Sequence, residues 1–135
     1  MVSLKDAVPV LKVKDVAKSI AWYQKTLGFT GDAFPPAPPH GFGILRLGDI
    51  EIMLQGDEHA VPKNPHPYEW DVYLRLEGSN IRALFAELSA LGVVTRRLER
   101  MFYGQIEFEI ADPDGHVLVL SQELDDAGDL PQPTG

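Results

Sequence analysis

The chain has 135 residues and no cysteine, which excludes disulfide bonds, thiolate metal sites and cysteine nucleophiles. Its formal net charge of −8 at pH 7 argues against nucleic-acid binding, because phosphate recognition needs a basic face. No stretch has the length and apolarity of a membrane span or a signal segment. We therefore expect a cytoplasmic protein with no membrane or nucleic-acid partner.

The first half of the chain is predicted to contain one helix among short strands. Asp15 offers an N-cap, apolar residues follow at helical spacing, and Gly28 stands where a left-handed residue ends a helix. The segment 34–41 must be a loop, because its prolines are incompatible with a helix or a strand ladder. The strands predicted in this half are 8–13, 43–47 and 50–55.

The second half repeats this plan at an almost constant spacing. Asn80 corresponds to Asp15 as the N-cap, and Gly92 corresponds to Gly28. The predicted strands are 72–76, 93–97, 105–111 and 117–121. The helix positions Val16, Ile20, Tyr23 and Leu27 recur as Ile81, Phe85, Leu88 and Leu91, at offsets of 64 or 65 residues.

The repeat predicts an α+β fold of two tandem βαβββ modules within one domain. One module alone is too small to bury its sheet well, so we expect both to curve as a mixed sheet around a shared cavity, with the helices outside. The expected order is module one at about 7–56, a linker at 57–68, module two at about 69–124, and a poorly ordered tail at 125–135.

Strand alternation divides each strand between the helix-covered face and the cavity. Glu51, Asp71 and Glu107 lie mid-strand on the cavity face, where a ligand contact and a solvated position are about equally consistent with the pattern. Glu109 and Arg75 are interpreted as solvated residues near the rim of the sheet. The other residues predicted on this face include Lys12, Met53, Gln55, Tyr73, Gln105, Val117, Val119 and Ser121.

Two segments resemble the vicinal oxygen chelate superfamily, which includes glyoxalase I, extradiol dioxygenases, and the fosfomycin- and bleomycin-resistance proteins. The segment VLKVKDVAKSIAWYQKTLGF at 10–29 is similar to the opening of that fold. The segment YGQIEFEIADPDGHVLVLSQ at 103–122 is similar to its closing signature. The resemblance implies the fold more than the chemistry, because this fold hosts unrelated activities.

The resemblance also implies where a metal ion would bind in the enzymes of this superfamily. Their four ligand positions fall on Val8, Met53, Asp71 and Val119, of which only Asp71 offers a hard oxygen donor. We therefore expect no metal cofactor. The chain is most similar to the metal-free bleomycin-resistance branch, whose members bind a drug in a groove shared between two chains, so a homodimer is expected.

Three functions remain open at this point. The first is metal-free binding or sequestration of a small organic ligand, with a cation favoured by the acidic cavity. The second is a metal-dependent glyoxalase-like lyase using Glu51, Asp71 and Glu107 as ligands, and the third is a structural or regulatory domain. No catalytic residue is assigned. The candidate ligand-binding residues are Glu51, Met53, Asp71, Tyr73, Arg75, Phe102, Tyr103, Glu107 and Val119.

Overall fold

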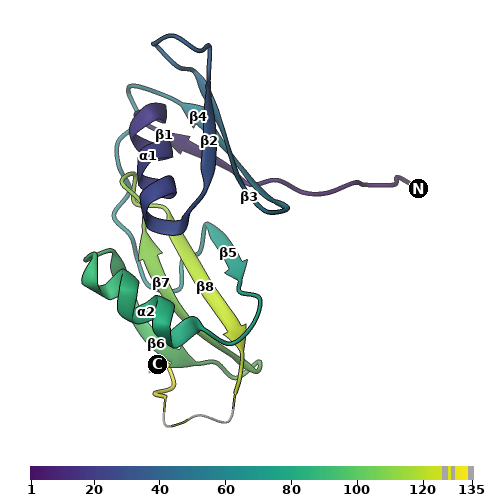
Figure 1. Ribbon diagram of the computed structural model, residues 1–135, viewed down its shortest axis with the longest axis vertical. Coiled ribbons are helices and arrows are strands. Elements are labelled where there is room, and N and C mark those ends of the chain that lie inside the picture. Colours follow the sequence, from purple (N-terminus) through teal and green to yellow (C-terminus); the bar gives the residue numbers. More distant parts are fainter. Residues whose placement is uncertain (126–127, 129, 134–135) are drawn as a thin grey trace. The chain divides into compact units, whose positions relative to one another are not determined.

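In the computed structural model, each half of the chain folds as the same βαβββ module (Figure 1). The structure describes residues 1–125, 128 and 130–133. It divides the chain into two units, Met1–Lys63 and Asn64–Gly135, with the division inside the predicted linker 57–68. The predicted α+β class and tandem modules are confirmed, while the cavity shared by both modules stays a prediction.

The first unit contains one helix and a four-stranded mixed sheet in the order β1-β4-β3-β2. Its first strand pairs parallel with its last, and the other neighbours are antiparallel. The helix starts as predicted, with the Asp15 carboxylate accepting from the Lys18 backbone N–H at 3.1 Å, and it ends at Gly28 with φ 83°. The elements are β1 (Val10–Val13), α1 (Val16–Leu27), β2 (Thr30–Phe34), β3 (Phe42–Leu47) and β4 (Ile50–Gly56).

The second unit has the same strand order, β5-β8-β7-β6, and the same parallel pairing of its first and last strands. This equivalence explains the sequence repeat, because each helix covers the corresponding face of its own sheet. Strands β6 and β8 run further than predicted. The elements are β5 (Val72–Arg75), α2 (Ile81–Ala90), β6 (Val94–Arg100), β7 (Gln105–Ala111) and β8 (Val117–Glu123).

Two details of the second helix were predicted wrongly. Asn80 makes no side-chain capping hydrogen bond, and the Ile81 N–H instead donates to the Gln122 side-chain oxygen at 3.0 Å. Leu91 was expected on the buried face but is 47% exposed, because the helix ends at Ala90. The repeat therefore preserves the position of the helix but not the way it begins and ends.

The C-terminal residues 126–127, 129 and 134–135, for which poor order was predicted, lie outside the described residues. Two described residues of the same segment make hydrogen bonds within the second unit. Asp125 accepts from Arg82 at 2.6 Å, and the Pro131 carbonyl accepts from the Arg100 N–H at 2.9 Å. Among the described residues, no helix is long and apolar enough to cross a membrane.

Candidate functional site

The sheet face of the second unit that α2 leaves uncovered carries most of its buried polar side chains. On β7, Glu107 and Glu109 are two residues apart and share this face. Across the neighbouring strand, Glu107 pairs with Ser121 and Glu109 pairs with Val119. The predicted alternation of the closing hairpin is therefore correct.

An irregularity in β6 adds two further charged residues to the same face. Arg96 and Glu99 are three positions apart, so regular alternation would place their side chains on opposite faces. The register shifts between them, with Arg96 opposite Glu109 and Glu99 opposite Glu107. Such a bulge adds one residue to the strand, and both side chains therefore reach the side of β7 that carries the two glutamates.

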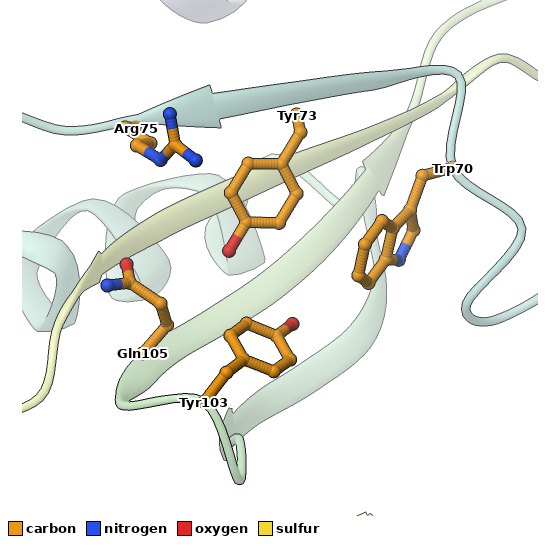
Figure 2. Close-up of a pocket in the computed structure, with 5 residues that line it drawn as sticks. All are labelled: Trp70, Tyr73, Arg75, Tyr103 and Gln105. Atoms are coloured by element: carbon orange, nitrogen blue, oxygen red, sulfur yellow. The ribbon is translucent and has the colours of Figure 1, made fainter.

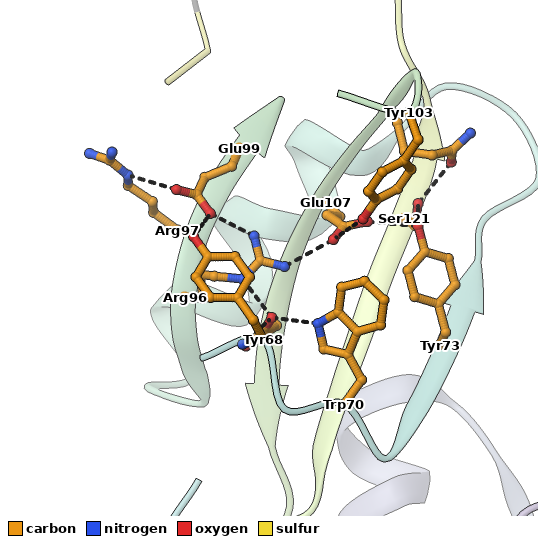
Figure 3. A network of polar contacts seen from close by, with 11 residues as sticks. Tyr68, Trp70, Tyr73, Arg96, Arg97, Glu99, Tyr103, Glu107 and Ser121 are labelled. Atoms are coloured by element: carbon orange, nitrogen blue, oxygen red, sulfur yellow. Dashed lines mark hydrogen bonds and ion pairs between the residues drawn. The ribbon is translucent and has the colours of Figure 1, made fainter. Parts of the chain in front are cut away.

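Arg96, Glu99, Glu107 and Glu109 form what we call the buried cluster. Figure 3 labels Arg96, Glu99 and Glu107. The guanidinium donates to Glu109 at 2.6 Å, to Glu99 at 2.7 Å and to Glu107 at 3.1 Å. All four residues are at most 6% exposed. Burial alone would lower the pKa of Arg96, but the hydrogen bonds to Glu99 and Glu109 outweigh it and raise the pKa above its ordinary value.

One guanidinium facing three carboxyl groups leaves the buried cluster with more formal negative than positive charge. Arg97 approaches Glu99 at 3.7 Å from outside, but its side chain is 60% exposed and solvent screens its charge. Burying unbalanced charge is costly unless hydrogen bonds satisfy it. The surrounding tyrosines and a tryptophan supply those hydrogen bonds.

Tyr68, in the segment before β5, contacts three members of the buried cluster. Its backbone has φ 67°, a left-handed conformation that non-glycine residues rarely adopt. In that conformation its N–H donates to Glu109, its hydroxyl donates to Glu99 at 2.7 Å, and its ring lies 4.5 Å from the Arg96 guanidinium carbon. The hydrogen bonds and the cation–π contact offset the backbone strain.

A pocket of about 500 Å³ opens beside the buried cluster (Figure 2). It is lined by Trp70, Tyr73, Arg75, Tyr103 and Gln105, with Trp70 at one side and Arg75 and Gln105 at the other. The three aromatic side chains all donate hydrogen bonds to the buried cluster. Trp70 Nε1 donates to Glu109 at 3.0 Å, and the hydroxyls of Tyr73 and Tyr103 donate to Glu107 at 2.6 and 2.7 Å.

These contacts fix the aromatic rings and keep the two pocket tyrosines protonated. Burial and the hydrogen bond to Glu107 raise the pKa of Tyr73 above 10.0 and raise that of Tyr103 further. The hydroxyl groups of both tyrosines point at the Glu107 carboxylate. The ring centroids of Trp70 and Tyr73 lie 5.2 Å apart. The pocket thus presents aromatic rings that are already held in place, with the carboxyl groups of the buried cluster behind them.

The structure brings together only some of the predicted site residues. Tyr73, Arg75 and Tyr103 line the pocket, and Glu107 lies directly behind it. Val119 is fully buried on β8 opposite Tyr73 and Glu109. Phe102 is 98% exposed, with its ring centroid 5.1 Å from that of Tyr103.

The remaining predicted site residues have other surroundings. Asp71 precedes β5 and accepts from the Val117 N–H at 2.9 Å. In the first unit, Glu51 and Met53 are half-buried on β4, and Glu51 lies 3.7 Å from Arg46. The pocket and the buried cluster consist of second-unit residues.

The interpretation of Glu109 as a solvated rim residue is wrong, because it is fully buried and paired with Arg96. Arg75 is exposed as expected, and its guanidinium carbon lies 5.6 Å from the Tyr73 ring centroid. The sequence reasoning missed Tyr68, Trp70, Arg96 and Glu99 as site residues. The aromatic residues flanking Glu69 gave a signal, whereas Arg96 and Glu99 depend on a bulge that alternation does not reveal.

Comparison with known proteins now identifies the family. The Glyoxalase/Bleomycin resistance protein/Dioxygenase superfamily profile matches residues 7–120. The chain belongs to this superfamily. A bleomycin resistance protein of Geobacillus stearothermophilus is 24% identical over 131 residues, covering 87% of this chain and 96% of the relative.

Solved structures agree with the superfamily fold. A glyoxalase-related enzyme from Clostridium phytofermentans matches with a TM-score of 0.71 and 19% identity, covering 91% of this chain and 98% of the other. The fosfomycin resistance protein FosX from Listeria monocytogenes matches with a TM-score of 0.68 and 16% identity, covering 92% and 96%. At these identities the likeness shows the fold alone.

The four positions that the resemblance implies as metal ligands offer few hard donors in this chain. Three of the four corresponding positions, Val8, Met53 and Val119, carry no hard donor, and the Asp71 carboxylate is engaged with β8. Within the described part of the chain, no group of three or more His, Asp and Glu side chains is arranged to hold a metal ion.

Proposed function

We propose that the protein binds a small, flat organic cation in the pocket of Trp70, Tyr73 and Tyr103 without using a metal ion. The observation that carries this proposal is the direct hydrogen bonding of all three rings to the buried cluster. Aromatic faces attract cations through their quadrupole, and negative charge behind the rings strengthens that attraction.

Size and preorganisation also support binding. A volume of about 500 Å³ falls within the range typical of small-molecule sites. Because the rings are already held by hydrogen bonds, a ligand would lose little free energy in ordering them. Arg75 lies over Tyr73 and acts as an internal cation there, so a bound cation would displace its guanidinium from that ring.

The similarity to bleomycin resistance proteins supports sequestration as the use of this binding, and a homodimer as the working assembly. The metal-dependent lyase remains the alternative, and its predicted carboxylates Asp71 and Glu107 already accept hydrogen bonds from within the second unit. Elemental analysis after incubation with nickel, zinc, manganese and iron, followed by desalting, separates the two. One retained ion per chain would contradict metal-free binding.

A matched pair of probes tests the proposed binding directly. N-methylquinolinium is a flat cation, and quinoline is its neutral counterpart at neutral pH. The chain has two tryptophans, so a Trp22→Phe variant leaves Trp70 as the fluorescent reporter in the pocket. We expect the cation to quench Trp70 and raise the melting temperature, with a weaker effect of quinoline.

Binding to the native state alone stabilises it by about 2.7 kcal/mol at 100 times the Kd, which is measurable as a thermal shift. Metal-free bleomycin serves as a larger probe in the same assay. A Tyr73→Ala variant should abolish the response to the cation. If neither the cation nor bleomycin changes the fluorescence or the melting temperature, the proposal is wrong.

A further inference from the structure

The charge on the pocket wall is concentrated at one side. Of the five described residues that line the pocket, only Arg75 carries a formal charge, and it lies at the side opposite Trp70 (Figure 2). Tyr73 and Tyr103 are held neutral, because burial and the hydrogen bond to Glu107 raise the pKa of both. A ligand in the pocket therefore meets a positive charge at this side and uncharged side chains elsewhere.

Arg75 reaches the pocket from the edge of the sheet. Its strand, β5, is an outer strand in the order β5-β8-β7-β6. Tyr73 and Arg75 are two residues apart on that strand, so their side chains share the face that carries the pocket. Arg75 is exposed, and exposed side chains change rotamer rapidly. The guanidinium can therefore move to meet a ligand while the sheet stays in place.

Arg75 has no acidic partner among the described residues. Its guanidinium makes a cation–π contact, with the guanidinium carbon 5.6 Å from the Tyr73 ring centroid, and no described carboxyl group forms an ion pair with it. By contrast, Arg82 pairs with Asp125 at 2.6 Å, and Arg96 pairs with the three glutamates of the buried cluster. A carboxylate binds a guanidinium more strongly than an exposed ring does, through two parallel hydrogen bonds. Arg75 is therefore available to an acidic group of a ligand.

The opposite charge lies behind the aromatic rings. Trp70, Tyr73 and Tyr103 all donate hydrogen bonds to carboxyl groups of the buried cluster, which has more formal negative than positive charge. A simple cation over Tyr73 competes with Arg75 for the same ring. A ligand that also carries an acidic group gives the displaced guanidinium a new partner. Two charges of opposite sign at separate places in one pocket therefore favour a ligand that carries both.

We propose that Arg75 binds an acidic group of the ligand, so that the pocket selects flat organic zwitterions over simple cations. The ligand class is an aromatic ring system that carries a fixed positive charge and a carboxylate. The charged ring lies against the aromatic side chains, and the carboxylate lies on the guanidinium, whose planar fork of donors matches it. This choice of ligand rests on the proposed function, because it needs the cation site and adds an acid site to it.

Three matched quinoline probes test this selection. The zwitterion is 1-methylquinolinium-3-carboxylate, the cation of similar size is 1-methylquinolinium-3-carboxamide, and the anion is quinoline-3-carboxylate. Isothermal titration calorimetry with the full chain at neutral pH measures the Kd of each. We expect the zwitterion to bind about tenfold more tightly than either other probe, as one charge-assisted pair provides.

The outcomes separate this inference from the proposed function. If the zwitterion and the carboxamide bind equally, the role of Arg75 is overturned while cation binding stands. If the anion binds as tightly as the zwitterion, the positive charge of the ring is not recognised and the zwitterion class is overturned. If neither of the two positively charged rings binds, the proposed function fails as well.

Arg75→Gln distinguishes recognition by Arg75 from a structural role. We expect this variant to bind the zwitterion about tenfold more weakly, because the partner of the carboxylate is gone. It should bind the carboxamide about two- to fivefold more tightly, because no internal cation competes for the Tyr73 ring. A structural change would move both Kd values in the same direction, and that result would overturn the proposal.

Two further variants control for charge and for shape. Arg82→Gln removes the same charge from α2, which covers the other face of the sheet, and should leave both Kd values unchanged. Arg75→Lys keeps the charge but not the planar fork, so we expect it to retain part of the preference for the zwitterion. If Arg82→Gln weakens zwitterion binding as much as Arg75→Gln does, net charge is the cause and the proposal is overturned.

Discussion

The two units share one topology but differ in where they keep their charges. In the first unit, Arg46 lies 3.7 Å from both Asp32 and Glu51, and its side chain is 50% exposed. In the second unit, the Arg96 side chain is 4% exposed among three buried carboxyl groups. The same βαβββ arrangement therefore supports an open ion-pair surface in one unit and a buried cluster in the other.

The difference originates in one hairpin of each unit. The β2–β3 pairing keeps one register from Thr30 to Phe34. The corresponding β6–β7 pairing shifts register twice, on either side of Arg96. Because a bulge changes the face that a side chain reaches, an arginine that regular alternation from Val94 would place on the helix-covered face, with Ile110, is brought onto the polar face. The site thus depends on a local irregularity rather than on the topology.

Replacing Arg96 in the second unit and Arg46 in the first tests this contrast most directly. We expect Arg96→Met to lower the free energy of unfolding by about 3–5 kcal/mol, because it leaves three buried carboxyl groups without their cation. Arg46→Met should cost about 0–1 kcal/mol, because its ion pairs are exposed. Denaturant unfolding at neutral pH measures both, and equal losses would contradict the distinction between the units.

The units also differ in how the helix meets the sheet. In the second unit, the ring of Phe85 on α2 packs edge-on against Phe108, with centroids 5.2 Å apart. In the first unit, glycines allow closer approach, and a Cβ on Gly43 would lie 2.9 Å from a Val16 methyl group. The first unit is therefore sensitive to small additions of volume.

Gly56→Ala tests this sensitivity. A Cβ at Gly56 would lie 2.8 Å from the His40 carbonyl oxygen, a backbone atom that cannot move independently of its loop. We expect a loss of about 1–3 kcal/mol in the free energy of unfolding, as is typical of overpacking. Gly41→Ala is the control, because a Cβ there meets nothing within 4 Å. If both variants unfold alike, steric contact at Gly56 is not the cause.

The sequence predicted the fold better than the site, and the reason is physical. Alternation and helix spacing act over whole elements, so the tandem modules and the shared face of Glu107, Tyr73 and Val119 followed from the pattern. The location of Arg96 follows from the register shifts in β6, and that of Tyr68 follows from a left-handed backbone. Neither feature leaves a periodic pattern in the sequence. The start of α2 was also mispredicted for this reason. Its Ile81 N–H is capped by Gln122, which is distant in the sequence, and not by the adjacent Asn80.

The smallest expected effect concerns the alkaline stability of the second unit. The pKa of Tyr103 is raised above 10.0 by burial and by the hydrogen bond to Glu107, so the folded state keeps a proton that the unfolded state releases. This contribution to stability is complete below about pH 10, the ordinary tyrosine value, and is lost as pH rises above it.

Tyr103→Phe removes that linkage. We expect the variant to be less stable than the wild type at about pH 8, since the hydrogen bond to Glu107 is lost, and to lose stability less steeply above about pH 10. Denaturant unfolding at a series of pH values measures both slopes. A slope unchanged by the substitution would mean that the buried cluster does not hold the Tyr103 proton.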